Sequence, residues 1–336
     1  MNKGLRRLGY LMGCMTLWLF VFSELDLARA KDPDYPTRPI NYIYPFSAGG
    51  SGEVAARALL GAASKHLGQP LVLICKPGAG GAIAATTIIN SKPDGYTIGT
   101  GSGSSAFVVP FSDGAPYRDL TGFTFIMNFS DYINTVMVKA DSPWKTWEEF
   151  IEWARKNPGE GKVGATAAKK QSAQGLVLRV IEQREKVKFT YIPFKGGPET
   201  TSALLGGHIT LYLSGADPSI LEGGQARVLL YMTPDKIPGF DAPTTVELYN
   251  FRTPNFMGVW GPKGIPEYIV KKLEDAFTKA LKEPSVTSVM KRLSLPVVYM
   301  NRSDMTKYIE KMFQETKETL TKLEKLEAEE EAKEKK

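Results

Sequence analysis

From residue 38 onward the chain alternates short apolar runs with longer segments in which apolar residues recur at helical spacing. The first example is the apolar run 40–44, followed by a loop at 45–52 rich in glycine and serine, and by a helical pattern over 53–67 that stops at Gly68. Short apolar runs bounded by turn residues are typical of buried strands, and a spacing of about three to four residues indicates helices. The pattern therefore predicts a strand, a loop and a helix in that order.

The same unit recurs along most of the chain. Further strands are predicted at 71–75, 96–99, 163–165, 189–192 and 209–213. Helices are predicted at 82–90, 147–156, 173–185, 266–282, 285–294 and 303–326, and another begins near Pro198. Strands that alternate with helices predict an α/β fold in which helices cover parallel sheets.

Most of the predicted strands end in a loop that leads into a helix. In such sheets ligands bind outside the carboxyl ends of the strands. Ser172 is the predicted N-cap of one of these helices, and Asp217 with Pro218 opens another. The free N–H groups and the positive dipole end of a helix N-terminus favour an anion. Several such termini around one cleft would hold a carboxylate without any catalytic group.

The first 30 residues predict a secretory signal peptide. Basic residues precede the apolar run 8–22, and alanine stands at positions 28 and 30, the two that a signal peptidase reads. The apolar run is shorter than the roughly 20 residues that span a bilayer. We therefore expect cleavage after Ala30 and a periplasmic protein. A lipid anchor at Cys14 is the less favoured alternative, because the apolar lead-in to this cysteine is short.

The charge pattern argues against nucleic-acid binding. The chain has 42 basic and 36 acidic residues, a formal net charge of +6. No basic block or interleaving of basic and aromatic residues accompanies this weak bias. We expect a small-molecule partner rather than DNA or RNA.

The residues that enzymes and metal sites need are scarce. The two histidines do not stand near cysteines in a zinc-type spacing. The glycine-rich loop 45–52 lacks the Lys-Ser/Thr pair of a phosphate-binding loop, and the Ser-x-x-Lys match at 142–145 has no companion motifs. We expect no metal, no cofactor and no catalytic residue, and a hydrolase is the remote alternative.

Five stretches of the sequence, in order, resemble the extracytoplasmic receptors of tripartite tricarboxylate transporters, also called Bug receptors. These stretches are 35–57, 68–81, 92–102, 192–211 and 255–270. One glycine-rich loop would be a weak match, whereas five ordered matches are specific. The resemblance implies a class II periplasmic-binding-protein fold, with two lobes around a hinged cleft, a bound carboxylate, and a membrane permease as partner.

The resemblance also implies how the chain divides. Residues 31–131 and 254–336 would form lobe 1, and residues 132–253 would form lobe 2. The hinges would lie near 129–132 and 251–254. We expect a monomer. From Lys322 onward the residues are almost all Glu, Lys and Ala, which predicts a solvated or frayed helix with no specific role.

Ligand contacts are implied on both lobes by the same resemblance. In the first lobe they are Phe46, Ser47, Ala48 and Ser51, with Ala79 and Ser104 close by. In the second lobe they are Thr166, Ala167, Gln171, Ser172, Lys195 and Gly196. Phe46 is an aromatic side chain that would cover an apolar ligand body.

Two departures from the family pattern bear on the ligand. The loop 166–171 is usually rich in Gly, Ser and Asn, whereas here it contains Lys169 and Lys170, which either clamp a more anionic ligand or face solvent. Glu53 stands where the family usually has Asp. Di- and tricarboxylates, aromatic acids and amides with a carboxylate all remain open. A sensor accessory that delivers its ligand to a signalling protein is the alternative to transport.

Overall fold

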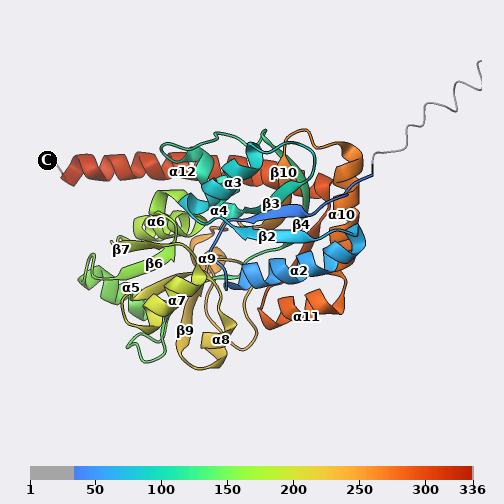
Figure 1. Cartoon of the computed structure of the whole chain (residues 1–336). Coiled ribbons are helices and arrows are strands. Elements are labelled where there is room, and N and C mark those ends of the chain that lie inside the picture. Colours follow the sequence, from blue (N-terminus) through green and yellow to red (C-terminus); the bar gives the residue numbers. More distant parts are fainter. Residues whose placement is uncertain (1–33, 335–336) are drawn as a thin grey trace, which may run out of the picture. The chain divides into compact units, whose positions relative to one another are not determined.

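The computed structural model describes residues 34–334. The predicted signal peptide, with Cys14, lies outside the described residues. Within the part of the chain that is described, no helix is both long and apolar enough to cross a membrane. The fold is the mixed α/β arrangement that the sequence predicts (Figure 1).

A six-stranded sheet is built from the two ends of the described chain. Its order is β11-β4-β10-β3-β1-β2. The strands are β1 (Ile40–Tyr44), β2 (Leu71–Cys75), β3 (Thr97–Ser102), β4 (Phe123–Ser130), β10 (Met257–Pro262) and β11 (Val297–Met300). β1 lies parallel to β2 and β3, whereas β10 lies antiparallel to β3 and β4.

A five-stranded sheet is built from the middle of the chain, in the order β7-β6-β8-β5-β9. The strands are β5 (Asn134–Lys139), β6 (Lys162–Thr166), β7 (Thr190–Phe194), β8 (Leu211–Gly215) and β9 (Ala226–Tyr231). β6 is parallel to β7 and β8, but β5 is antiparallel to β8 and β9. The prediction of parallel sheets therefore holds for only part of each sheet, because each also contains antiparallel pairs. β5 follows β4 directly from the other sheet, and a strand that does not return through a covering helix is free to pair antiparallel.

Helices cover both sheets. In the segments that form the first sheet they are α2 (Ser51–Leu67), α3 (Ala82–Ile89), α4 (Gly103–Phe107), α10 (Glu267–Leu281), α11 (Pro284–Arg292) and α12 (Arg302–Glu334). In the middle segment they are α5 (Trp147–Lys156), α6 (Ala173–Glu185), α7 (Gly197–Leu205), α8 (Pro218–Glu222) and α9 (Thr245–Tyr249). Single 3-10 turns are η1 (Ala79–Gly81), η2 (Val109–Phe111) and η3 (Lys169–Gln171).

Strand β3 is longer than the sequence predicts. It continues through Gly101 and Ser102, which the glycine- and serine-rich pattern places in a loop. A Cβ at Gly101 would lie 2.8 Å from the ring of Phe256 and 2.9 Å from that of Trp260. Glycine is therefore needed here for close packing of a strand against aromatic rings rather than for a turn.

The residues from Lys322 onward are a helix, as predicted, but this helix is not merely solvated or frayed. Helix α12 runs on to Glu334 and passes α6 (Figure 1). Its buried Leu320 and Leu323 pack with apolar residues of α6. Arg179 of α6, with 4% of its side chain exposed, donates to both carboxylate oxygens of Glu327 at 2.7 and 2.8 Å. The C-terminal part of α12, which follows the last strand of the first sheet, therefore packs against α6 of the second sheet.

We predict that Glu327→Gln lowers the free energy of unfolding by about 1–2 kcal/mol, because it leaves Arg179 buried without a countercharge. Burial opposes ionisation of Glu327, but the hydrogen bonds and charge of Arg179, with the charges of Lys170 and Lys169, hold its pKa below its ordinary value. A lowered carboxyl pKa contributes stability that is full above the unfolded pKa and lost as pH falls through the folded value.

The cost of Glu327→Gln should therefore shrink in acid, which urea denaturation at neutral and acidic pH would measure. Glu330→Gln is the matched control, since Glu330 of α12 pairs at 3.0 Å with Lys186, the C-cap residue of α6, and both side chains are largely exposed. We expect this control to cost less than about 0.5 kcal/mol. Equal effects of the two variants would contradict the role given to the buried Arg179.

Candidate functional site

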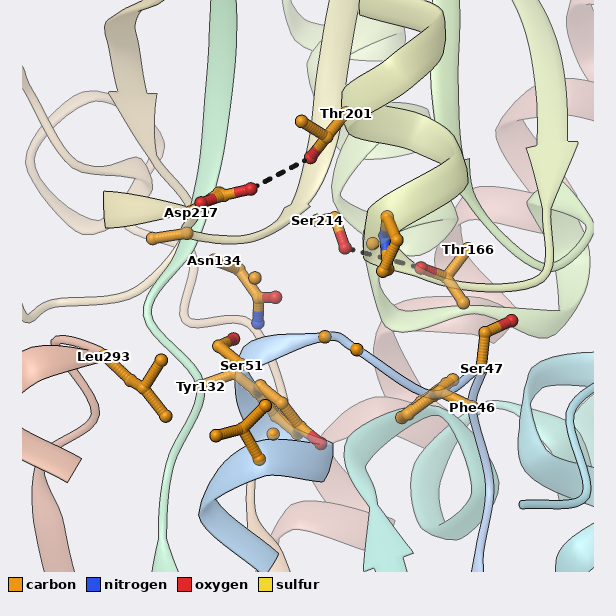
Figure 2. Close-up of a pocket in the computed structure, with 18 of the residues that line it drawn as sticks. Phe46, Ser47, Ser51, Tyr132, Asn134, Thr166, Thr201, Ser214, Asp217 and Leu293 are labelled. Carbon is orange, nitrogen blue, oxygen red and sulfur yellow. Dashed lines mark hydrogen bonds between the residues drawn. The ribbon is translucent and has the colours of Figure 1, made fainter. Parts of the chain in front are cut away.

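A cavity of about 520 Å³ lies where loops of the two sheets face each other (Figure 2). The loop between β1 and α2 forms one wall, and the ends of β6 and β8 with helices α6, α7 and α8 form the other. Volumes of about 300–1,000 Å³ are usual for small-molecule sites. The cavity is therefore the candidate ligand site.

The N-terminus of α2 supplies the first wall. Its N-cap is Gly50, in extended conformation, and no side chain of the described residues caps it. The first N–H groups of this 17-residue helix therefore face the cavity beside Ser51 without a side-chain acceptor. Glu53 of α2, with 3% exposure, accepts from the Gly49 N–H at 3.2 Å and from Arg57 Nε at 2.9 Å. The bond to Gly49 holds the loop between β1 and α2 against the first turn of the helix.

Two tyrosines close the floor beneath this loop. The hydroxyls of Tyr44 and Tyr132 lie 3.0 Å apart, and Phe46 packs edge-on against both rings. A Cβ at Gly52 would lie 2.5 Å from each hydroxyl oxygen, so only glycine lets α2 start here. Burial raises the pKa of Tyr132 to about 12 and holds that of Tyr44 well above its ordinary value. Both phenols are neutral at physiological pH, and this floor carries no charge.

The second wall consists mainly of short polar side chains from several elements. Thr166 is the last residue of β6 and Ser214 the last but one of β8, and their hydroxyl oxygens lie 3.4 Å apart. Thr201 of α7 donates to Asp217 Oδ2 at 3.2 Å, and Asn134, the first residue of β5, also lines the cavity (Figure 2). These groups offer both donors and acceptors to a polar ligand.

Helix N-termini converge on the cavity. Besides Ser51 of α2, the first residues of α4, α6, α7 and α8 line it, namely Gly103, Ala173, Gly197 and Pro218. The Ala173 N–H is already used, because it donates to the hydroxyl of Ser104 at 3.0 Å. Positive dipole ends thus gather at a site whose wall has few basic side chains.

The predicted contact residues divide into two groups. Those that line the cavity are Phe46, Ser47, Ser51, Ser104 and Thr166. Those outside its wall are Ala48, Ala79, Ala167, Gln171, Ser172, Lys195 and Gly196.

Several members of the second group have other contacts. Ser172 caps α6 by accepting from the Gly175 N–H at 3.0 Å. Gly196 and Gln171 lie where the facing loops touch each other. A Cβ at Gly196 would be 3.0 Å from that of Ser47. Lys169 pairs with Glu182, and neither it nor Lys170 lines the cavity.

Much of the second wall was not predicted from the sequence. Its additional polar residues include Asn134, Gln174, Thr201, Ser214 and Asp217. Asp217 carried a local signal, since Asp before Pro indicates a helix start, and it does cap α8 by accepting from the Ser219 N–H at 3.2 Å. The Asp-Pro pattern does not predict that the Asp217 carboxylate lines a cavity. Among the described residues, no cluster of His, Cys, Asp and Glu has the arrangement of a metal site.

Comparisons with known proteins agree on one family. A family model described as the tripartite tricarboxylate transporter family receptor matches residues 55–325. A Cupriavidus necator protein described as the UPF0065 protein in the gbd 5′ region is 32% identical over 302 residues, covering 88% of this chain and 90% of that protein.

Solved structures share the fold over most of their length. The periplasmic binding protein BugD superposes with a TM-score of 0.80 at 25% identity, covering 86% of this chain and 98% of BugD. An R. palustris protein with adipate gives a TM-score of 0.79 at 26% identity, with the same coverage of each chain.

Proposed function

Because this chain belongs to the tripartite tricarboxylate transporter receptor family, we propose that it captures a small carboxylate-containing ligand and presents it to the membrane subunits of a transporter. Proteins of this family are periplasmic solute-binding receptors and not enzymes. Residues 1–30 would act as the export signal of this chain, and residues 31–336 as the mature receptor.

The observation that carries this proposal is the uncapped N-terminus of α2 in the cavity wall. A carboxylate there would accept hydrogen bonds from free backbone N–H groups and meet the positive end of the helix dipole. The similar R. palustris structure contains adipate, a carboxylate. A carboxylate ligand thus fits both the wall of this cavity and the chemistry of a relative.

Ligand capture would proceed by closure of two lobes, residues 31–131 with 254–336 and residues 132–253, about hinges near 129–132 and 251–254. Hydrogen bonds between the facing walls support this mechanism. Ser47 Oγ donates to Glu199 Oε1 at 2.9 Å, and the Ala173 N–H donates to Ser104 Oγ. A ligand that contacts both walls binds the closed form more tightly and shifts the population toward it. The closed form would then dock on the permease.

Thermal unfolding of the exported protein in the presence of mono-, di-, tricarboxylic and aromatic acids tests the proposal. A ligand at about 100 times its Kd adds roughly 2.7 kcal/mol to the free energy of unfolding, which corresponds to a rise in Tm of roughly 5 °C or more. Nucleotides and divalent metals serve as controls. Stabilisation by a nucleotide or a metal, with a flat response to every acid, would contradict a carboxylate receptor.

A further inference from the structure

The ionisable side chains that line the cavity are more acidic than basic. Asp217 and Glu222 are acidic, and among the described lining residues Arg292 alone is basic, with an exposed side chain. A ligand with two carboxylates could place one at the start of α2. Its second negative charge would then face a wall that offers no buried cation and already contains the carboxylate of Asp217.

Asp217 is fixed in place with an acceptor position to spare. Its Oδ1 accepts from the N–H and the hydroxyl of Ser219, at 3.2 and 2.6 Å, and its Oδ2 accepts from Thr201 at 3.2 Å. An ionised carboxylate can accept about four hydrogen bonds, so one position on Oδ2 remains. Figure 2 places this carboxylate on the second wall, on the opposite side of the cavity from the loop between β1 and α2.

Gln174 of α6 supplies a second acceptor on this wall. Its Nε2 donates to Asn134 Oδ1 at 3.3 Å, while its buried Oε1 has no hydrogen-bond partner among the residues that the structure describes. A buried acceptor without a partner costs free energy, which a donor on the ligand would recover. The unused acceptor positions on Asp217 and Gln174 would therefore be satisfied by a hydrogen-bond donor on the ligand.

We propose, building on the function proposed above, that the ligand is a monocarboxylate whose other end donates hydrogen bonds, as an ammonium or a primary amide does. The carboxylate lies at the N-terminus of α2, and the donor end lies at Asp217 and Gln174. The receptor then rejects the dicarboxylate of equal length, because that ligand leaves the acceptors unpaired and adds a like charge beside Asp217.

Isothermal titration of the exported protein with matched ligands tests this inference. The probes are the dicarboxylates from succinate to suberate, their monoamides, and the ω-amino acids of the same chain lengths. At the chain length that binds best, we expect a donor-ended acid to bind at least ~10-fold more tightly than the dicarboxylate. The monoamide and amino-acid arms distinguish an amide from an ammonium.

Asp217→Asn removes the charge and keeps a residue that caps helices well. We expect this variant to bind the dicarboxylate more tightly and the ω-amino acid more weakly, so that the preference falls by ~10-fold or reverses. Asp241→Asn is the matched control, since it makes the same substitution at a fully exposed side chain outside the cavity wall and should leave the preference intact.

A wild type that binds a dicarboxylate as tightly as its monoamide and its amino acid would overturn this inference and leave the proposed function standing. An Asp217→Asn variant with an unchanged preference would also overturn it. If no acid of these series binds but a tricarboxylic or aromatic acid does, only the inference fails; if no acid of any kind binds the wild type, the proposed carboxylate function fails as well.

Discussion

Replacing Gly80 by alanine is expected to weaken ligand binding by at least ~100-fold, about 2.7 kcal/mol. Gly80 has φ +64° in η1, and a Cβ there would lie 2.0 Å from the carbonyl oxygen of Gln171 in η3. The added Cβ is bonded directly to the backbone of η1 and meets a backbone oxygen of η3, so no side-chain rotation can relieve the overlap. Because η1 follows β2 of one sheet and η3 follows β6 of the other, the methyl group would force the facing loops apart and disfavour the closed form.

Gly224→Ala is the matched control for this prediction. Gly224 has the same φ of +64°, but nothing lies within 4 Å of its Cβ position. Both variants share a backbone strain of about 1 kcal/mol, so their melting temperatures should fall alike. Titration with the best ligand should separate them, and small-angle scattering should find the Gly80 variant more open. Undiminished binding by this variant would mean that the two loops do not need to meet around the ligand.

The elements that depend on local sequence could be predicted. The apolar runs 40–44 and 71–75 coincide with β1 and β2, because turn residues bound each of them. Ser172 caps α6 as its position before a helical pattern indicates. The antiparallel pairing of β5 could not be predicted, since it depends on which sheet the chain enters after residue 131 and no local pattern encodes that choice.

The two walls of the cavity also differ in how far local sequence predicts them. The family resemblance of the contiguous stretch 35–57 implied contacts at Phe46, Ser47 and Ser51, and these three residues line the cavity. Thr201 and Asp217 belong to different helices and meet only after the chain has folded. Such residues have no sequence signature beyond their local capping roles. The sequence therefore predicts that Asp217 begins a helix, but not that it lines the cavity.

The end of α12 follows the same rule. Its charged residues resemble a solvated tail because the partner of Glu327 lies 148 residues away, on α6. A run of charged residues predicts a solvent-facing helix when no countercharge lies nearby in the sequence. Here the countercharge is Arg179, on a helix that is distant in the sequence.

Asp131→Asn is expected to raise the free energy of unfolding by about 1–3 kcal/mol at pH 8, because it removes a charge buried without full compensation. Burial raises the pKa of Asp131 to about 7, the charge of Arg252 opposes this shift and that of Asp235 adds to it. Its Oδ1 has no hydrogen-bond partner among the described residues. The residue lies between β4 and β5, in one of the predicted hinges.

The sign of the pH dependence follows from the raised pKa. A carboxyl that binds its proton more tightly in the folded state costs nothing in acid, and it destabilises the fold progressively as pH rises from the unfolded value of about 4 to the folded value of about 7. The gain from Asp131→Asn should therefore be largest at pH 8 and nearly absent at pH 4. Guanidinium denaturation of both proteins at the two pH values measures it.

Asp235→Asn is a useful control, since it removes the like charge that faces Asp131 while changing an exposed side chain. We expect this control to change stability by less than about 0.5 kcal/mol. A loss of stability in Asp131→Asn at pH 8 would instead mean that an ion pair with Arg252 more than offsets the cost of burying the ionised carboxylate. The two chain crossings between the sheets, near 131 and 252, would then be joined by an ion pair, and closure would depend on salt rather than on pH.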